Sequence, residues 1–336
     1  MNNDFDLSQF DDIYDEDEDS LANDTPSFDV VLKTLSSSNV NIMDRAIIYG
    51  LSGLSNDDIN KLEPVWQDVH AATRRKIVRT LIDYSEVDIR LDYRSTGMMC
   101  LHDADPGVRE AAIELLWEDQ SLELMNELIR IVKQDDNREV RAATLTALGR
   151  FILAGELEHL PQDETVAALN AALAIWENTK EDVSVRRRAL EAISNSSHKI
   201  VPSAIEEGYN SPYQQMQVSA VFAMGRSYDA DRWGEIVIDL LDSEDPEMLY
   251  EAARAAGELS LDDAVPKLAQ ITMDGDREVM IVAVEALGEI GGKTATRVLD
   301  ALMEKAEEEE DDELLEVIED AVANASLVDQ LNDYEF

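Results

Sequence analysis

Histidine, cysteine and acidic side chains are the residues of this sequence that could do chemistry, and their spacing offers little for a catalytic or metal site. The four histidines stand at positions 70, 102, 159 and 198, and none is followed by glutamate. Zinc and iron sites gather imidazoles in one place, so histidines spread over separate segments disfavour such a site. Cys100, His102 and Asp103 lie at one turn, where a buried thiol and a surface imidazole are the simpler interpretation.

Motifs of other catalytic classes are also missing from the sequence. It contains no Gly-x-Ser-x-Gly nucleophile elbow, no phosphate-binding loop and no dinucleotide fingerprint. The acidic run 307–313 lacks the Asp-x-Asp-x-Asp-Gly spacing of a selective Ca²⁺ loop, so we interpret it as a solvated acidic face. We therefore expect a non-enzymatic protein with no catalytic residue, no metal and no cofactor.

Charge is the next strong feature. Lys and Arg total 28 against 73 Asp and Glu, which gives a formal net charge of −45. A field of this sign repels nucleic acid and anionic lipid and favours a basic protein partner. No apolar run approaches the ~20 residues of a membrane span, and the N-terminus lacks a secretory pattern. Cys100 is the single cysteine, so we expect a reducing compartment, with the cytoplasm as the location.

A repeated ten-residue pattern decides the fold class. Similar segments begin at residues 108, 140, 185, 216, 248 and 279, and their starts are 31 or 32 residues apart except for a gap of 45 after residue 140. A period of this length indicates stacked repeats, each with two helices. Within 140–149, apolar or small residues follow the 3.6-residue spacing of a helix with one buried face. An Asp ahead of five of the six segments is expected to cap the first turn, and the segment that begins at residue 216 lacks one.

The segments 105–112, 136–143 and 286–288 carry a further resemblance. Their pattern Asp-Pro-x-Val-Arg-x-Ala-Ala, followed by Ala-Leu-Gly, resembles HEAT repeats of the short prokaryotic kind also called PBS-lyase-like repeats. The resemblance implies an all-α, right-handed α-solenoid (armadillo-like) of about nine two-helix repeats. It also implies a ladder of Asp–Arg pairs between repeats, here Asp105 with Arg109 and Asp136 with Arg141. Gln217, Leu249 and Met280 replace the Arg in later repeats, so we expect the ladder to stop there.

Composition divides the chain into three parts. Residues 1–27 are predicted to be a disordered acidic arm, because they hold dense like charge. Residues 28–327 form the predicted solenoid, with an acidic segment at 304–313 near its C-terminal cap. Residues 328–336 are predicted to be a loose acidic tail. The surplus at 151–162 predicts an enlarged loop or a lengthened helix, either a plain surface insertion or a carrier of binding residues.

A solenoid offers a long surface to a partner, so the leading hypothesis is a scaffold or adaptor that binds a protein, with basic segments, on the concave second-helix surface. Geometry alone selects outward positions of those helices as contacts: Arg75, Arg79, Glu110, Glu114, Arg187, Glu191 and Glu285. A bilin-lyase-like chromophore attachment factor is the alternative, and it rests on the resemblance of the repeats. The oligomeric state stays open, and self-association is a third possibility.

Two further groups of residues have competing interpretations. The basic clusters 74–79 and 186–188 are either seats for an anionic segment, such as the chain's own arm, or ladder arginines that balance local carboxylates. We favour the ladder. The four tryptophans, Trp66, Trp117, Trp176 and Trp233, fall in different repeats, so packing in the core or between repeats explains them better than a ligand cage.

Overall fold

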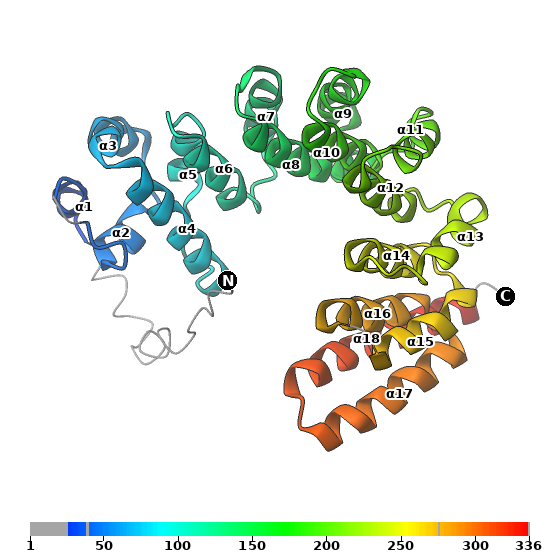
Figure 1. Cartoon of the computed structure of the whole chain (residues 1–336). Coiled ribbons are helices and arrows are strands. Elements are labelled where there is room, and N and C mark those ends of the chain that lie inside the picture. Colours follow the sequence, from blue (N-terminus) through cyan, green and yellow to red (C-terminus); the bar gives the residue numbers. More distant parts are fainter. Residues whose placement is uncertain (1–25, 38–39, 275, 335–336) are drawn as a thin grey trace. The chain divides into compact units, whose positions relative to one another are not determined.

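A computed structural model describes residues 26–37, 40–274 and 276–334, and all regular structure in these ranges is helical. Eighteen α-helices follow one another in nine consecutive pairs within these residues, which confirms the predicted α-solenoid of two-helix repeats (Figure 1). The helices are α1 (Phe28–Leu35), α2 (Arg45–Ile48), α3 (Asn56–Asp68), α4 (Ala71–Val87), α5 (Arg94–Cys100), α6 (Pro106–Leu115), α7 (Leu122–Gln134), α8 (Arg138–Glu156), α9 (Gln162–Glu177), α10 (Val183–Ile193), α11 (Val201–Tyr209), α12 (Gln214–Arg226), α13 (Ala230–Leu240), α14 (Pro246–Glu258), α15 (Val265–Asp274), α16 (Arg277–Ile290), α17 (Gly292–Glu309) and α18 (Asp312–Tyr334). Two short 3₁₀ turns complete them, at Tyr49–Leu51 and Asp262–Ala264.

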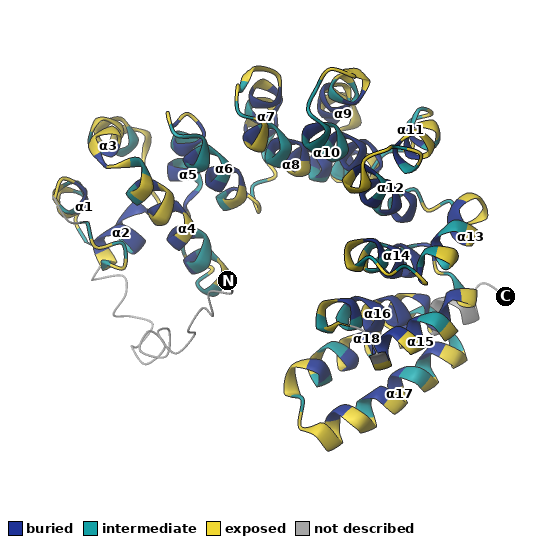
Figure 2. Cartoon of the chain, viewed as in Figure 1, coloured by how far each residue is buried: buried dark blue, intermediate teal, exposed yellow. Residues whose placement is uncertain are grey.

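The chain divides into two compact units, which we call unit 1 (to Leu124) and unit 2 (from Met125). In unit 1 the first helices α1, α3 and α5 contact one another in turn, and so do the second helices α2, α4 and α6. In unit 2 the second helices α8, α10, α12, α14, α16 and α18 form the corresponding succession, and each first helix from α9 onward contacts its own partner. The second helices α12, α14 and α16 are buried or half-buried over most of their length, whereas α4 and α18 carry many exposed residues (Figure 2).

Short polar caps start the second helices where the sequence predicted them. Asp105 accepts a hydrogen bond from the Val108 N–H at 3.1 Å, and Asp245 accepts one from Met248 at 2.9 Å. Each cap satisfies one free N–H of the first turn. In α8 the capping residue is Asn137 rather than the expected Asp136, and its side chain accepts from Val140 at 3.0 Å.

Glycine near the ends of α12, α14 and α16 permits close approach of the next second helix. A Cβ on Gly257 would lie 2.8 Å from the Cα of Ala286, and a Cβ on Gly288 would lie 2.7 Å from the Cα of Ala321. Because these atoms belong to neighbouring backbones, only a residue without a Cβ fits the present spacing. The Ala-Leu-Gly pattern is therefore a packing motif of the stack.

The segment boundaries predicted from the sequence can be compared with the observed helices at the insertion and at the two ends of the chain. The surplus at 151–162 is a lengthened helix, because α8 runs for 19 residues to Glu156. The predicted loose tail at 328–336 is wrong for its first part, since α18 continues to Tyr334. The apolar stripe that packs α18 extends to the half-buried Val328, which lies beside Gly291. Residues 1–25 of the predicted arm lie outside the described residues, and Pro26 and Ser27 directly precede α1.

Candidate functional site

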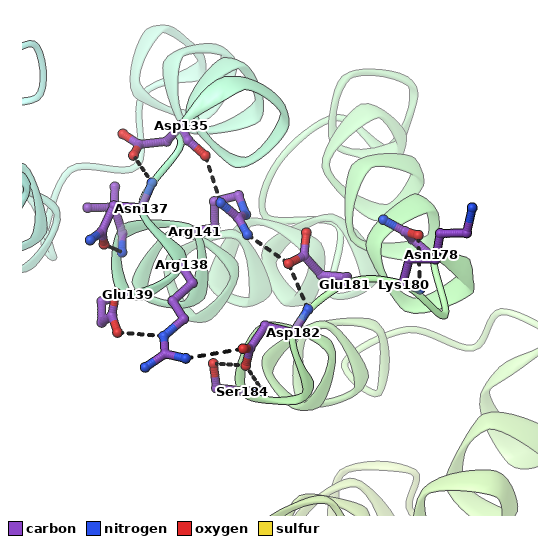
Figure 3. Close-up of polar contacts among 11 residues, drawn as sticks. Asp135, Asn137, Arg138, Glu139, Arg141, Asn178, Lys180, Glu181, Asp182 and Ser184 are labelled. Atoms are coloured by element: carbon purple, nitrogen blue, oxygen red, sulfur yellow. Dashed lines mark hydrogen bonds and ion pairs between the residues drawn. The ribbon is translucent and has the colours of Figure 1, made fainter.

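The arginine ladder is the first polar feature of the second-helix face. In α8, Arg141 donates to the backbone oxygen of Asp135 at 2.8 Å and to Glu181 at 2.7 Å, and Glu181 stands in the turn before α10 (Figure 3). Arg138 reaches the same turn through Asp182 at 3.2 Å. Each guanidinium therefore joins one repeat to the next, because its fork of donors serves two acceptors.

The ladder in unit 1 uses different acids from those expected. Arg74 pairs with Asp103 at 2.8 Å, with both side chains buried, and the Trp66 indole also donates to Asp103 at 2.8 Å. Arg109 donates to the Asp103 backbone oxygen at 2.8 Å, so the predicted Asp105–Arg109 pair is wrong. Asp105 instead caps α6 and receives Arg75 at 2.8 Å. The predicted Asp136–Arg141 pair is likewise replaced by Glu181, which the turn brings closer.

The arginine ladder stops at this register in the later repeats, as expected, and other side chains make the polar contacts there. Gln217 donates to the backbone oxygen of Ser211 at 2.9 Å, and Gln214 donates to the cap Asp245. Arg277, at the start of α16, holds Asp311 before α18 at 2.6 Å. The connection has moved to the first residue of the helix, because Leu249 and Met280 carry no donor.

A pocket of about 350 Å³ opens on the second-helix face of unit 2, and we call it the α14 pocket. Its walls come from α10, α12, α14 and α16 with the cap Asp276, so four successive repeats contribute. The lining residues are Arg187, Arg188, Glu191, Val218, Pro246, Glu247, Tyr250, Glu251, Asp276, Glu278 and Val279. Five carboxylates and two guanidinium groups therefore share this pocket.

Both guanidinium groups of the pocket are committed to one carboxylate. Glu191 accepts from Arg187 at 3.3 Å and from Arg188 at 2.6 Å, and it also accepts from the Ser219 hydroxyl. The prediction that Glu191 points outward is wrong, since it is 7% exposed. Its charge is tolerated in the interior because three donors surround it. Burial lowers the pKa of Arg187, and repulsion from Arg188 adds to this.

The other carboxylates of the pocket are poorly compensated. Glu247 and Glu278 are exposed, and neither forms an ion pair with any residue that the structure describes. Glu251 pairs with Arg254 at 2.7 Å, yet burial still raises its pKa above the ordinary glutamate range. The ring of Tyr250, 37% exposed, stands beside them. The pocket therefore presents uncompensated negative charge next to an aromatic face.

A second acidic residue, Glu258, lies about two turns beyond Glu251 on α14. Glu258 in α14 is nine-tenths buried and faces Arg226 at 3.3 Å and Arg254 at 3.8 Å. Burial raises its pKa as well. Arg254 also lies over the Phe222 ring, 4.1 Å from its centroid. Glu258 is therefore compensated by two guanidinium groups, unlike the exposed carboxylates of the α14 pocket.

The remaining predicted contact residues are divided between the units. In unit 1, Arg79 and Glu114 are exposed and 3.9 Å apart, Arg75 holds Asp105, and Glu110 is half-buried. In unit 2, Glu285 is exposed on α16, where its charge helps to raise the pKa of Tyr250. The α14 pocket brings together two of the seven predicted residues, Arg187 and Glu191.

Sequence reasoning missed the pocket residues of α14 and α16. Glu247 and Glu278 each stand one place before the repeat starts at 248 and 279, so their shared register was visible in the sequence. Glu251 stands three places after its start, level with Arg188 and Ser219 of the earlier repeats. Aligning the repeats column by column would have grouped these side chains on one face.

Metal ligation and the basic clusters can be judged from the same geometry. Within the described residues, no group of three or more His, Cys, Asp or Glu is arranged to hold a metal ion. Cys100 is buried, which raises its pKa, and His102 is exposed.

Arginines of both basic clusters are paired with nearby carboxylates, as the ladder interpretation predicted. Over the described residues, none of the helices has the length and apolar character needed to span a bilayer.

Comparisons with known proteins agree with this geometry. The sequence profile of HEAT repeats matches residues 98–194 and 234–323, more than half of the chain. The complex of CpcE and CpcF of phycocyanin lyase from Nostoc sp. PCC7120 is similar in fold, with a TM-score of 0.54, 16% identity, and coverage of 82% of this chain and 93% of that chain. The Escherichia coli protein YibA gives a TM-score of 0.46 at 17% identity, covering 86% and 99%. No curated protein sequence matches this chain.

Proposed function

Because the chain belongs to the HEAT-repeat family, we propose that it is a non-enzymatic scaffold that binds a basic segment of a partner protein on the second-helix surface of unit 2. One observation carries this proposal. The α14 pocket holds five carboxylates, and its two guanidinium groups are already bound to Glu191. What remains at its mouth is negative charge without a cation.

A lysine or arginine of the partner fits this pocket on physical grounds. Glu247 and Glu278 stand on neighbouring repeats, so one cationic side chain between them gains from both. The Tyr250 ring adds a face over which an ammonium or guanidinium is attracted. Burial destabilises the charged form of Glu251, and Arg254 does not fully compensate for this. An incoming cation would offset part of the remaining desolvation cost.

The charge of the whole chain supports the same partner. A net charge of −45 speeds the encounter with a basic segment and makes binding sensitive to salt. Exposed pairs are screened at distances beyond ~8 Å at physiological ionic strength. We expect the complex to weaken as salt rises.

The test compares two variants that lose the same charge. Glu247→Gln/Glu278→Gln removes the pocket's exposed carboxylates, whereas Glu307→Gln/Glu308→Gln removes two exposed carboxylates of α17. Each variant and the parent chain capture proteins from native lysate at two salt concentrations, and the retained proteins are identified by mass spectrometry. We expect a protein that the α17 variant retains and the pocket variant loses. Equal retention by both variants would contradict the proposal.

A chromophore attachment factor is the alternative, and the similarity of fold to the phycocyanin lyase complex is its support. It predicts a shifted visible absorption band when the purified chain is mixed with a bilin. A scaffold for a basic protein segment predicts an unchanged spectrum.

A further inference from the structure

Unit 1 carries a groove of about 990 Å³ that the proposed function does not use. It lies at the C-terminal ends of α4 and α6, with the 88–93 loop between them, and we call it the Ile89 groove. The lining residues are Ile82, Ser85, Glu86, Ile89, Leu91, Asp92, Tyr93, Arg94, Glu114, Leu115, Leu116, Trp117, Glu118, Asp119 and Gln120.

Large apolar side chains are exposed in this groove. Ile89 is 97% exposed and Trp117 is 45% exposed, so the prediction that Trp117 packs in the core or between repeats is wrong. Ile82, Leu91 and Leu115, which also line the groove, are half-buried. Contiguous exposed apolar side chains in a soluble fold mark surfaces that bind another molecule.

The loop that presents Ile89 is held in place. Asp88 accepts from the Arg90 backbone N–H at 3.1 Å and from its guanidinium at 2.8 Å, which closes a tight turn around Ile89. Asp92 accepts from the Arg94 N–H at 2.9 Å on the other side. The exposure of Ile89 is thus built into a hydrogen-bonded turn, which reduces the ordering cost of binding.

Carboxylates surround the apolar side chains. Those that line the groove are Glu86, Asp92, Glu114, Glu118 and Asp119. The one cation in the lining, Arg94, is neutralised by Asp119 at 2.8 Å and Glu123 at 2.6 Å. An apolar centre with an acidic rim complements a segment that has an apolar stripe flanked by Lys or Arg.

We propose that the Ile89 groove is a second docking surface, which binds an amphipathic basic helix of a partner protein through its apolar face. The chain's own acidic arm and a second copy of the chain carry the wrong charge for this rim. The groove lies entirely in unit 1, so this proposal does not depend on the α14 pocket of unit 2.

The probe is a 14-residue peptide of Leu and Lys with leucines at helical spacing, and its control has the same composition scrambled so that no apolar face forms. The chain is labelled with 5-fluorotryptophan, and the Trp117 ¹⁹F resonance is assigned with Trp117→Phe. At physiological salt we expect the amphipathic peptide to move the Trp117 resonance and leave Trp176 and Trp233, both buried in unit 2, in place.

Two matched variants decide the outcome. Ile89→Ser removes apolar surface from the groove, and Val166→Ser does the same at an exposed position of α9. We expect Ile89→Ser to weaken peptide binding about tenfold and Val166→Ser to leave it unchanged, since only Ile89 contributes apolar surface to the groove. An unmoved Trp117 resonance, or equal affinity for the scrambled peptide, would overturn the proposal. Glu247→Gln/Glu278→Gln should not affect this signal, so the two proposals fail separately.

Discussion

Second helices α4, α6, α8 and α10 use an arginine at one register, whereas α14 and α16 have Leu249 and Met280 there. In the first group each guanidinium donates to a backbone oxygen of the preceding helix end or turn, and Arg74, Arg141 and Arg186 also reach a carboxylate of the next repeat. In the second group no cation occupies this register, while Glu251 and Glu258 are desolvated on α14. The same position in the repeat therefore holds a structural arginine in the first group and no cation in the second.

We propose that this difference determines where the chain binds a cation. Where arginines connect the repeats, local carboxylates such as Asp103 and Glu181 are already satisfied. Where the ladder arginines are absent, the exposed carboxylates Glu247 and Glu278 have no ion-pair partner among the described residues. The neighbouring helices there pack through close Gly–Ala contacts. Negative charge available to a partner is therefore a property of α14 and α16 rather than of acidity alone.

The largest expected effect is the loss of the buried pair in unit 1. Arg74→Met leaves Asp103 buried with the Trp66 indole as its remaining side-chain donor, and we expect a loss of about 3–5 kcal/mol in the free energy of unfolding. Met280→Leu at the same register breaks no ion pair, so its cost should stay under about 1.5 kcal/mol. Urea denaturation measures both. Similar losses would show that the register carries no special role in unit 1.

The next largest effect on stability is expected where neighbouring second helices pack closely, and it should differ between the two groups. Gly288→Ala places a Cβ 2.7 Å from the backbone of Ala321, and we expect it to destabilise the chain by about 1–3 kcal/mol. Gly149→Ala meets its nearest atom at 3.3 Å and gains helix propensity, so we expect a change within about 1 kcal/mol, toward higher stability. Thermal denaturation of both variants checks this order, and a more damaging Gly149→Ala would refute it.

The pH dependence of stability should have opposite signs at two glutamates. Burial raises the folded-state pKa of Glu258, so its contribution to stability is full below the ordinary glutamate pKa and is lost as pH rises through the raised value. Hydrogen bonding from Arg138 lowers the pKa of Glu139, so its contribution is present above the ordinary value and is lost as pH falls. We expect Glu258→Gln to remove a fall in stability with rising pH and Glu139→Gln to remove a rise. Unfolding free energies measured from about pH 2.5 to 7 cover both slopes, that of Glu139 below the ordinary glutamate pKa and that of Glu258 above it. Slopes of one sign would contradict the assignment.

The smallest effect is expected at the moved ladder of the later repeats. Arg277 holds Asp311 and Glu313 near the surface, and Arg277→Gln should cost about 0.5–1 kcal/mol in low salt. High salt should remove most of this difference, because exposed pairs are screened. A cost that persists in high salt would indicate a buried, structural pair.

The fold could be predicted from the sequence because the same local pattern recurs in each repeat. The period of 31 or 32 residues, the cap Asp and the Ala-Leu-Gly ending predicted the helix pairs, whereas the surplus at 151–162 left an enlarged loop and a lengthened helix both open. The partners of the arginines did not follow, because Arg141 has several acids within reach of its long side chain and the turn geometry selects Glu181. The exposure of two side chains was also predicted wrongly, because it depends on neighbours that are remote in sequence. Glu191 is buried because donors from α12 and from its own helix surround it. Trp117 is exposed because it lies past the end of α6.

The most direct test of the account places a photo-crosslinker in each group of second helices. Benzoylphenylalanine replaces Tyr250 beside the α14 pocket in one variant and the exposed Thr146 of α8 in the other. Each variant is irradiated with the protein captured from lysate, and the crosslinked peptide is identified by mass spectrometry. We expect a crosslink from position 250 to a segment rich in Lys and Arg, and none from position 146. A crosslink from position 146 alone would contradict the claim that the repeats without a ladder arginine form the binding face.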